Sequence, residues 1–189
     1  IQDAFNLNTM SGLKKFIKCY NGCLTCSAKG TSVSNTKCNT CDVLSEYYSF
    51  STNGEQCYHK DSKINHYYFI CETTDATGTT CTFKPCHTSC LTCDEESSTQ
   101  FTKCELCDKS NNYFPLEDDE TQCHKSDEDV IGYFFNASQQ KFLKCSIACK
   151  KCSKKEQNGK TNCDVDECAN NYAPVVSDKT QCYPKTQKG

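Results

Sequence analysis

The sequence lacks several residue types and patterns that common protein classes need. It has no tryptophan, no arginine, one methionine and four prolines among 189 residues. Without the bidentate arginine fork, and with a formal net charge of −3, the chain does not fit a nucleic-acid-binding protein. No apolar run approaches the roughly 18–20 residues of a membrane-spanning helix. Residues 1–11 are mixed and polar and contain no signal peptide, so we expect a mature product or a fragment of a longer protein.

Cysteine is the residue that is abundant. The chain contains 20 cysteines, more than one residue in ten, which is typical of a disulfide scaffold. Only 36% of the residues are hydrophobic even with cysteine included. One large apolar core is therefore excluded, and most of the order must come from crosslinks. Thiols at this density indicate an extracellular or cell-surface protein that passes through the secretory pathway.

One pattern of six cysteines occurs three times along the chain. A phenylalanine stands three residues before each opening cysteine, and a tyrosine stands ten residues before each closing one. Because aromatic residues keep the same register as the cysteines, the pattern predicts a tandem array of small modules. The phenylalanines are Phe16, Phe83 and Phe142, and the tyrosines are Tyr47, Tyr113 and Tyr172.

The repeat divides the chain into seven segments. We expect a lead-in linker hairpin at 1–18, repeat 1 at 19–57, a linker hairpin with its own disulfide at 58–85, repeat 2 at 86–123, a linker hairpin at 124–144, repeat 3 at 145–182 and a tail at 183–189. On this division the chain opens with a linker hairpin and ends before one.

Short aromatic runs flanked by Asn, Gly, Ser and Asp predict β-hairpins, and no window shows convincing helical periodicity. Within repeat 1, residues 47–57 predict a hairpin in which Asn53-Gly54 forms a tight turn with positive φ. Further hairpins are expected at 67–83 and 133–142 and in the lead-in at 4–16. The predicted fold class is small and disulfide-rich: an elongated tandem array of short β-hairpin modules with little or no helix.

The cysteine order C-x3-C-x2-C, then C-x2-C, an aromatic hairpin and a closing C resembles the furin-like, growth-factor-receptor type of cysteine-rich repeat over about residues 16–182. In that family the first cysteine pairs with the third, the second with the fourth, and the fifth with the sixth. The resemblance implies Cys19–Cys26, Cys23–Cys38, Cys41–Cys57, Cys86–Cys93, Cys90–Cys104, Cys107–Cys123, Cys145–Cys152, Cys149–Cys163 and Cys168–Cys182. Cys71 and Cys81 would then pair inside their linker hairpin, and all 20 cysteines are used.

The third repeat departs from this pattern, because four residues instead of two separate Cys163 from Cys168. The closed loops are short, so each bridge would contribute on the order of 2–3 kcal/mol by restricting the unfolded chain. The repeat tyrosines are expected to pack over the neighbouring cystines. The Lys-, Asn- and Thr-rich composition without arginine is also similar to the large cysteine-rich surface proteins of ciliates and related protists.

Zinc binding is the main chemical alternative to disulfides. Cys23, Cys26, Cys38 and Cys41 have four-thiolate spacing, as do the equivalent cysteines of repeat 2. The third repeat breaks the second pair, and zinc would leave Cys19, Cys57 and their equivalents without a role. We therefore predict disulfides, with no metal and no cofactor.

Two further kinds of site, a calcium loop and a catalytic histidine, are alternatives to ordinary surface loops. Residues 164–168, Asp-Val-Asp-Glu-Cys, resemble the start of a calcium-binding EGF-like module, but the later cysteines of such a module are missing, which favours a solvated acidic loop. The four histidines, His59, His66, His87 and His124, have no paired nucleophile in the sequence, and oxidised cysteines leave no thiolate. The chain is therefore predicted not to be an enzyme.

Asn136-Ala-Ser138 is the one standard sequon for N-glycosylation, and it falls at the expected turn of a linker hairpin. Asn21 and Asn39 stand in the rarely used N-x-C form, beside expected bridges. The Ser/Thr-rich stretches 31–40 and 97–102 are possible positions for O-linked sugar. We expect a glycan at Asn136.

Two functions fit these observations. The first is a non-catalytic extracellular structural protein, a disulfide-stapled rod whose copies assemble head to tail into a surface coat or filament. The second is the stalk or ectodomain of a cell-surface receptor or adhesion protein. The partner would be another copy of the chain in the first case and a different extracellular protein in the second. The two functions differ in the role of the chain's ends. Residues of the lead-in hairpin (Phe5, Leu7 and Phe16) and of the tail (Tyr183 and Pro184) would contact another copy in the first case only.

Overall fold

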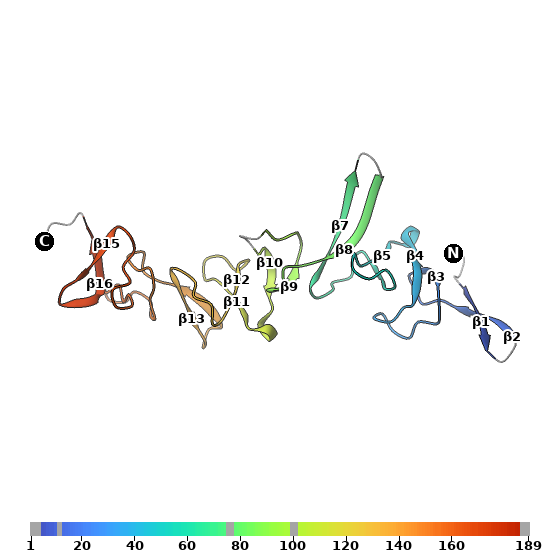
Figure 1. Ribbon diagram of the computed structural model, residues 1–189, viewed down its shortest axis with the longest axis horizontal. Coiled ribbons are helices and arrows are strands. Elements are labelled where there is room, and N and C mark those ends of the chain that lie inside the picture. The colour runs from blue at the N-terminus through green and yellow to red at the C-terminus, as the bar shows by residue number, and fades with distance from the viewer. Residues whose placement is uncertain (1–4, 11–12, 75–77, 99–101, 186–189) are drawn as a thin grey trace. The chain divides into compact units, whose positions relative to one another are not determined.

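The computed structural model describes residues 5–10, 13–74, 78–98 and 102–185, which form a succession of short antiparallel hairpins (Figure 1). Each sheet in these ranges has two strands, and the two strands are neighbours in the sequence. The helical structure described is limited to two single 3-10 turns. The predicted fold class, a small disulfide-rich array of hairpins with little helix, is confirmed. The chain divides into two compact units, residues 1–86 and 87–189.

The first unit contains four hairpins and one 3-10 turn. The pairs are β1 (Phe5–Met10) with β2 (Leu13–Lys18), β3 (Cys23–Cys26) with β4 (Cys38–Cys41), β5 (Tyr47–Ser49) with β6 (Cys57–His59), and β7 (Tyr67–Thr74) with β8 (Gly78–Pro85). The turn η1 (Val43–Ser45) begins after Asp42, whose side chain accepts a hydrogen bond from the Ser45 amide. Such N-terminal capping satisfies a backbone donor that the short turn leaves without a partner.

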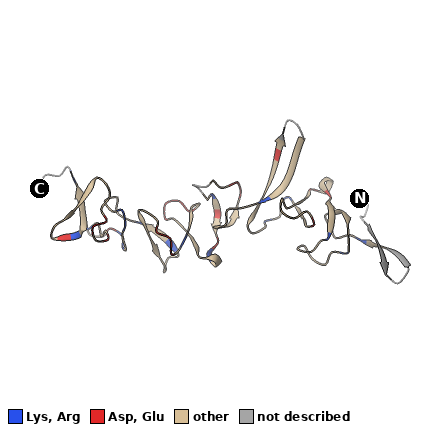
Figure 2. Cartoon of the chain, viewed as in Figure 1, with Lys and Arg blue, Asp and Glu red and all other residues tan. Residues whose placement is uncertain are grey.

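The second unit repeats this arrangement. Its pairs are β9 (Cys90–Cys93) with β10 (Cys104–Cys107), β11 (Tyr113–Pro115) with β12 (Cys123–Lys125), β13 (Tyr133–Asn136) with β14 (Lys141–Lys144), and β15 (Tyr172–Val175) with β16 (Asp178–Pro184). The turn η2 (Lys109–Asn111) is capped by the buried Asp108, the counterpart of Asp42. Lysines and acidic residues are interspersed in both units (Figure 2).

Every cysteine of the chain is disulfide-bonded. In all three repeats the bridge between the second and fourth cysteines has a Cα–Cα distance of 5.1 Å. The bridge between the fifth and sixth cysteines has a Cα–Cα distance of 5.5–5.6 Å. The bridges join Cys19–Cys26, Cys23–Cys38, Cys41–Cys57, Cys71–Cys81, Cys90–Cys104, Cys107–Cys123, Cys145–Cys152, Cys149–Cys163 and Cys168–Cys182. These are the partners that the family resemblance implies, and Cys86 and Cys93 are also in the bonded state.

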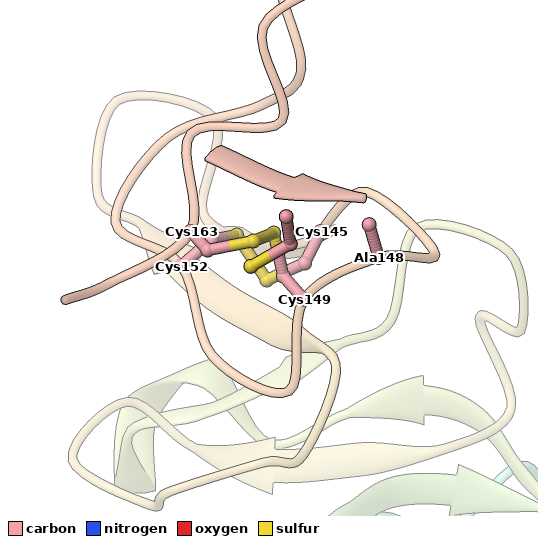
Figure 3. Packing of buried hydrophobic residues seen from close by; sticks show 6 residues of the cluster. Cys145, Ala148, Cys149, Cys152 and Cys163 are labelled. Carbon is pink, nitrogen blue, oxygen red and sulfur yellow. A yellow bond between two sulfur atoms is a disulfide. The ribbon is translucent and has the colours of Figure 1, made fainter. Parts of the chain in front are cut away.

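Disulfide-bonded cysteines make up most of the buried interior of a repeat. In repeat 3 the buried cluster consists of Cys145, Ala148, Cys149, Cys152, Cys163 and Cys182 (Figure 3). The partly buried Tyr172 packs against it. Repeat 1 has the equivalent cluster with Tyr47 against it. Tyr47 and Tyr172 therefore pack on cystines as predicted. The cystines take the place that aliphatic side chains hold in a larger domain.

The four-residue spacing in repeat 3 changes its local structure but not its bridges. In repeats 1 and 2 the paired strands place the second cysteine opposite the fifth and the third opposite the fourth. Repeat 3 keeps these pairs as two isolated bridges, Cys149 with Cys168 and Cys152 with Cys163. Asp166, one of the four residues between Cys163 and Cys168, has a φ of +61°. The insertion thus removes a strand pair and leaves the crosslinks in place.

The prediction of a tight positive-φ turn at Asn53-Gly54 is wrong. The strands of that hairpin end at Ser49 and resume at Cys57, so a longer loop joins them. Neither Asn53 nor Gly54 is among the residues with positive φ. The Asn53 side chain instead accepts a hydrogen bond from the Glu55 amide at 2.9 Å. The first residue of this loop, Phe50, forms a β-bridge with Phe83 of the next hairpin, a contact with a distant segment that the local sequence does not show.

Candidate functional site: the junction between a repeat and a linker hairpin

The closing hairpin of repeat 1 is joined to the linker hairpin that follows it by a parallel β-bridge. Phe50, just after β5, bridges Phe83 on β8. The Ser51 amide donates to the Phe83 carbonyl at 3.0 Å, and the Thr82 hydroxyl donates to the Ser49 carbonyl at 2.8 Å. These hydrogen bonds fix the register of one hairpin on the other, so the two form a defined joint instead of a loose hydrophobic contact.

Aromatic side chains fill this first junction. The Phe50 ring lies 4.3 Å from that of Tyr67, 5.0 Å from that of Tyr58 and 5.9 Å from that of Phe83, measured between centroids. Phe69 lies 5.2 Å from Phe83. Tilted and edge-on pairs at these separations add to the free energy gained from burial alone. Phe83 is 1% exposed, which makes it the centre of the junction.

The second unit builds the same junction from different residues. Leu116, just after β11, forms a parallel bridge with Phe142 on β14, and the Glu117 amide donates to the Phe142 carbonyl at 2.8 Å. Phe114 and Phe135 contact each other, and Phe142 is 1% exposed. The register within each linker hairpin is also shared, since Phe69 pairs with Phe83 and Phe135 with Phe142. The junction is therefore a repeated structural element.

A set of ionic contacts supports the second junction. Lys144 pairs with Asp118 at 2.6 Å, and Lys155 of repeat 3 pairs with Glu117. The Tyr133 hydroxyl donates to Asp118 at 2.6 Å. The hydrogen bonds from Lys155 and Lys144 lower the pKa of Glu117, and those from Lys144 and Tyr133 lower the pKa of Asp118. Burial, followed by the bond to Asp118, raises the pKa of Tyr133 to about 12. We call these five residues the clasp.

The lead-in hairpin carries one half of a junction. Phe16 on β2 stands three residues before Cys19, as Phe83 and Phe142 stand before Cys86 and Cys145. Its strand register is also the same, since Leu7 pairs with Phe16 as Phe69 pairs with Phe83. Yet Phe16 is 73% exposed, against 1% for its two counterparts. The residue that forms the centre of the other junctions here faces solvent.

The closing hairpin of repeat 3 carries the other half. Val175 occupies the position of Phe50 and Leu116, three residues after the repeat tyrosine, and Tyr183 occupies that of Tyr58 and His124. Pairing of Ala173 with Tyr183 matches that of Tyr48 with Tyr58. Val176 is 97% exposed and Tyr183 is 49% exposed. This hairpin thus presents an apolar surface where a linker hairpin docks on the other two repeats.

The linker hairpin β13–β14 places the sequon residue Asn136 at the end of β13. The Asn136 side-chain oxygen accepts hydrogen bonds from the Ser138 hydroxyl at 2.7 Å and from the Gln139 amide at 3.0 Å. Both contacts use the oxygen of the amide and not the nitrogen that carries a glycan. Ala137 and Ser138 are exposed and Asn136 is half-buried, so the sequon lies on the surface.

The cysteines with zinc-type spacing are not four neighbouring thiolates in the structure. Cys23 is bonded to Cys38, whereas Cys26 and Cys41 are bonded to Cys19 and Cys57. In the acidic loop of repeat 3, Asp164 accepts a hydrogen bond from Ser153 at 2.7 Å, and Asp166 pairs with Lys179 at 3.0 Å. These carboxylates have partners within the protein.

The histidines interact with surface loops, and one of them contacts a hydroxyl. His59 lies 3.7 Å from Glu46 and 3.5 Å from Asp61, and His124 lies 3.1 Å from Glu128. His87 is 2.7 Å from the Ser89 hydroxyl, although the sequence predicts no hydroxyl or thiol partner for it. Ser89 is fully buried next to Cys104, and its amide also donates to the His87 ring at 3.3 Å. Both contacts lie at the start of repeat 2.

No helix within the described part of the chain has the length and apolar character to cross a membrane. The chain matches no protein-family model, and the comparisons found no similar curated protein and no similar solved structure.

Proposed function

We propose that this chain is a non-catalytic extracellular structural protein whose copies assemble head to tail, with the lead-in hairpin of one copy docking on repeat 3 of the next. The observation that carries the proposal is the 73% exposure of Phe16, whose two counterparts are 1% exposed at the centres of complete junctions. The disulfide-rich hairpin repeats fit an extracellular structural role.

The two internal junctions specify the contact between copies. Phe16 would form a parallel bridge with Val175 of the next copy, as Phe83 does with Phe50. The Phe16 carbonyl would accept a hydrogen bond from the Val176 amide, and the Phe16 ring would cover Val175 and Tyr183. Because the two surfaces differ and lie on different hairpins, the contact is heterologous and can propagate into a filament or coat.

The experiment compares the oligomeric state of the wild-type protein with that of two half-site variants by analytical ultracentrifugation at rising concentration. Phe16→Asp disrupts the half-junction on the lead-in hairpin, and Val176→Asp disrupts the half-junction on repeat 3. We expect the wild type to associate and each variant to remain monomeric. A mixture of the two variants should form dimers and stop there, because each variant keeps one intact half. Leu44→Asp is the matched control, since Leu44 is an exposed apolar residue outside the junctions.

A wild-type protein that stays monomeric at millimolar concentration would overturn head-to-tail assembly. So would an equal effect of Leu44→Asp, or a variant mixture that forms no dimer. A monomer would favour the alternative role as the stalk or ectodomain of a receptor or adhesion protein. All three substituted positions, the control included, are exposed, so circular dichroism should show the same fold throughout.

The proposal includes an N-linked glycan at Asn136. The hydroxyl-to-oxygen contact within the sequon and its surface position support attachment there. Protein secreted from a eukaryotic host should lose mass on enzymatic deglycosylation, and Ser138→Ala should abolish that loss. An unchanged mass in the wild type would refute the glycan without affecting the proposal on assembly.

A further inference from the structure

One disulfide lies outside the repeats. Cys71 on β7 and Cys81 on β8 are directly opposite each other in the linker hairpin of the first unit. The hairpin β13–β14, at the equivalent place in the second unit, contains no cysteine. Since that hairpin docks by the same bridge without a crosslink, the Cys71–Cys81 bond is not required for the junction, and it calls for another explanation.

This disulfide is also the most accessible one. Cys71 is exposed and Cys81 is only half-buried, whereas each of the other disulfide-bonded pairs described includes at least one buried cysteine. On the same face of the hairpin, two positions closer to the tip, Thr73 pairs with Thr79, and their exposed hydroxyls lie 3.0 Å apart. A thiolate that approaches from the tip side therefore meets polar, exposed side chains before it reaches the sulfurs.

Opening this disulfide leaves the attachment of the hairpin intact. On the inner side, the next pair on the same face of the hairpin is Phe69 and Phe83, which belong to the aromatic junction. The bond from Thr82 to the Ser49 carbonyl and the ion pair between Lys84 and Glu72 also hold the hairpin independently of the sulfurs. The Cys71–Cys81 pair can thus change its redox state while Phe83 stays buried.

We propose that Cys71–Cys81 is a site of thiol–disulfide exchange, at which an external thiolate becomes covalently attached to this protein. The incoming thiolate attacks the sulfur of the more exposed Cys71. A new bond forms between the two sulfurs, the Cys71–Cys81 bond breaks, and its electron pair leaves on Cys81 as a thiolate. The product is a mixed disulfide at Cys71 and one free thiol at Cys81, with no change in the total number of disulfides.

The test exposes the oxidised wild-type protein to reduced glutathione for increasing times and then traps free thiols with iodoacetamide. Cleavage before Asp75 separates Cys71 from Cys81 for mass spectrometry. We expect glutathione on Cys71 and the alkyl group on Cys81, at a rate at least about tenfold above that of any other cysteine pair, because exchange rates follow access to the sulfur. Cys41–Cys57 and Cys168–Cys182 are internal controls, since each has one half-buried and one buried cysteine.

A second arm uses a folded protein with a single surface thiol in place of glutathione. An adduct in both arms identifies the site as open to protein thiols, and an adduct with glutathione alone restricts it to small thiols. The double variant Cys71→Ser/Cys81→Ser should form no adduct and keep its near-ultraviolet circular dichroism. The proposal fails if Cys71 and Cys81 react no faster than the control cysteines, or if the first adduct forms on another cysteine.

Discussion

At the scale of single residues, the position before the second cysteine of each repeat shows how one backbone contact tolerates different side chains. Gly22, Ser89 and Ala148 stand there, and each carbonyl accepts a hydrogen bond from an amide near the fifth cysteine at 2.8–2.9 Å. In repeat 1 the glycine has a φ of +88°, and the Tyr47 ring lies against it. The repeats therefore share the contact but reach it with different local backbones.

Gly22→Ala should destabilise repeat 1. An added Cβ would lie 2.3 Å from the Tyr47 ring, in a backbone conformation that side chains rarely adopt. The combined strain should lower the free energy of unfolding by about 2 kcal/mol or more. Urea denaturation with the disulfides intact, followed by tyrosine fluorescence, measures it. Gly54→Ala is the control, because Gly54 has open space around its Cα, and its effect should stay within about 0.5 kcal/mol.

The clasp gives a second residue-scale prediction, on pH. Hydrogen bonds lower the pKa of Asp118 below its ordinary value of 3.8 and that of Glu117 below 4.5. A carboxylate with a lowered pKa contributes stability that is fully present above its ordinary pKa and is lost as the pH falls through the lowered one. The support that the clasp gives to the junction should thus persist through mildly acidic pH and disappear only below about pH 4.

Lys144→Met tests this assignment, because Lys144 is the first cause of the lowered pKa of Asp118. Carboxyl-carbon NMR during an acid titration should show the pKa of Asp118 rising towards its ordinary value in the variant. Lys125→Met is the control, since the Lys125 ammonium lies over the Tyr113 ring instead of the clasp. An unchanged titration of Asp118 in Lys144→Met would contradict the role of this ion pair.

At the scale of elements, the hairpins could be predicted because each one leaves a local signal. Aromatic runs such as Tyr67-Tyr-Phe69 stand at fixed distances from the cysteines, and the strands form where those runs lie. The capped 3-10 turns were missed, although Asp42 and Asp108 directly follow the fifth cysteine and are a usable signal for a cap. The Asn53-Gly54 signal was misleading, because a contact with a distant segment overrode the local turn preference.

The junctions could be predicted only in part. The recurrence of Phe16, Phe83 and Phe142 before the opening cysteines was visible in the sequence, but the docking of Phe83 and Phe142 on the preceding repeat was not. Phe50 and Phe83 are far apart in the sequence, and a parallel bridge between two separate hairpins has no local sequence pattern. Leu116 stands where repeat 1 has Phe50, so the residue of the repeat that bridges the linker hairpin need not be aromatic. The half-junctions became evident only from exposure.

Phe83→Ala and Phe142→Ala should each undock a linker hairpin. Truncation of a buried phenylalanine costs about 3–5 kcal/mol, and the surrounding rings cannot close the cavity completely. Phe16→Ala, in dilute monomeric protein, should change the free energy of unfolding by less than about 0.5 kcal/mol. Urea denaturation of the three variants measures the difference. Equal effects at the three positions would contradict the distinction between complete junctions and half-junctions.

At the scale of the whole molecule, stability depends on crosslinks because the repeats have little else to bury. The bridges of the repeats close short loops, because the paired cysteines are 7 to 16 positions apart in the sequence. A loop of about 15 residues reduces the entropy of the unfolded chain by the equivalent of about 3 kcal/mol. Aromatic rings are concentrated at the junctions, whereas the clusters within the repeats consist mainly of cystine.

Complete reduction should therefore unfold the repeats. The oxidised protein should have a mass about 20 Da below that of the reduced protein, one hydrogen for each of its 20 cysteines. Adding a strong reductant should abolish the near-ultraviolet circular dichroism and the cooperative thermal transition, because the aromatic junctions have no folded repeats left to join. Limited reduction of Cys71–Cys81 alone should leave both signals unchanged, since Phe83 stays docked. A fully reduced chain that kept its thermal transition would show that burial of aromatic side chains, and not the cystines, holds the repeats together.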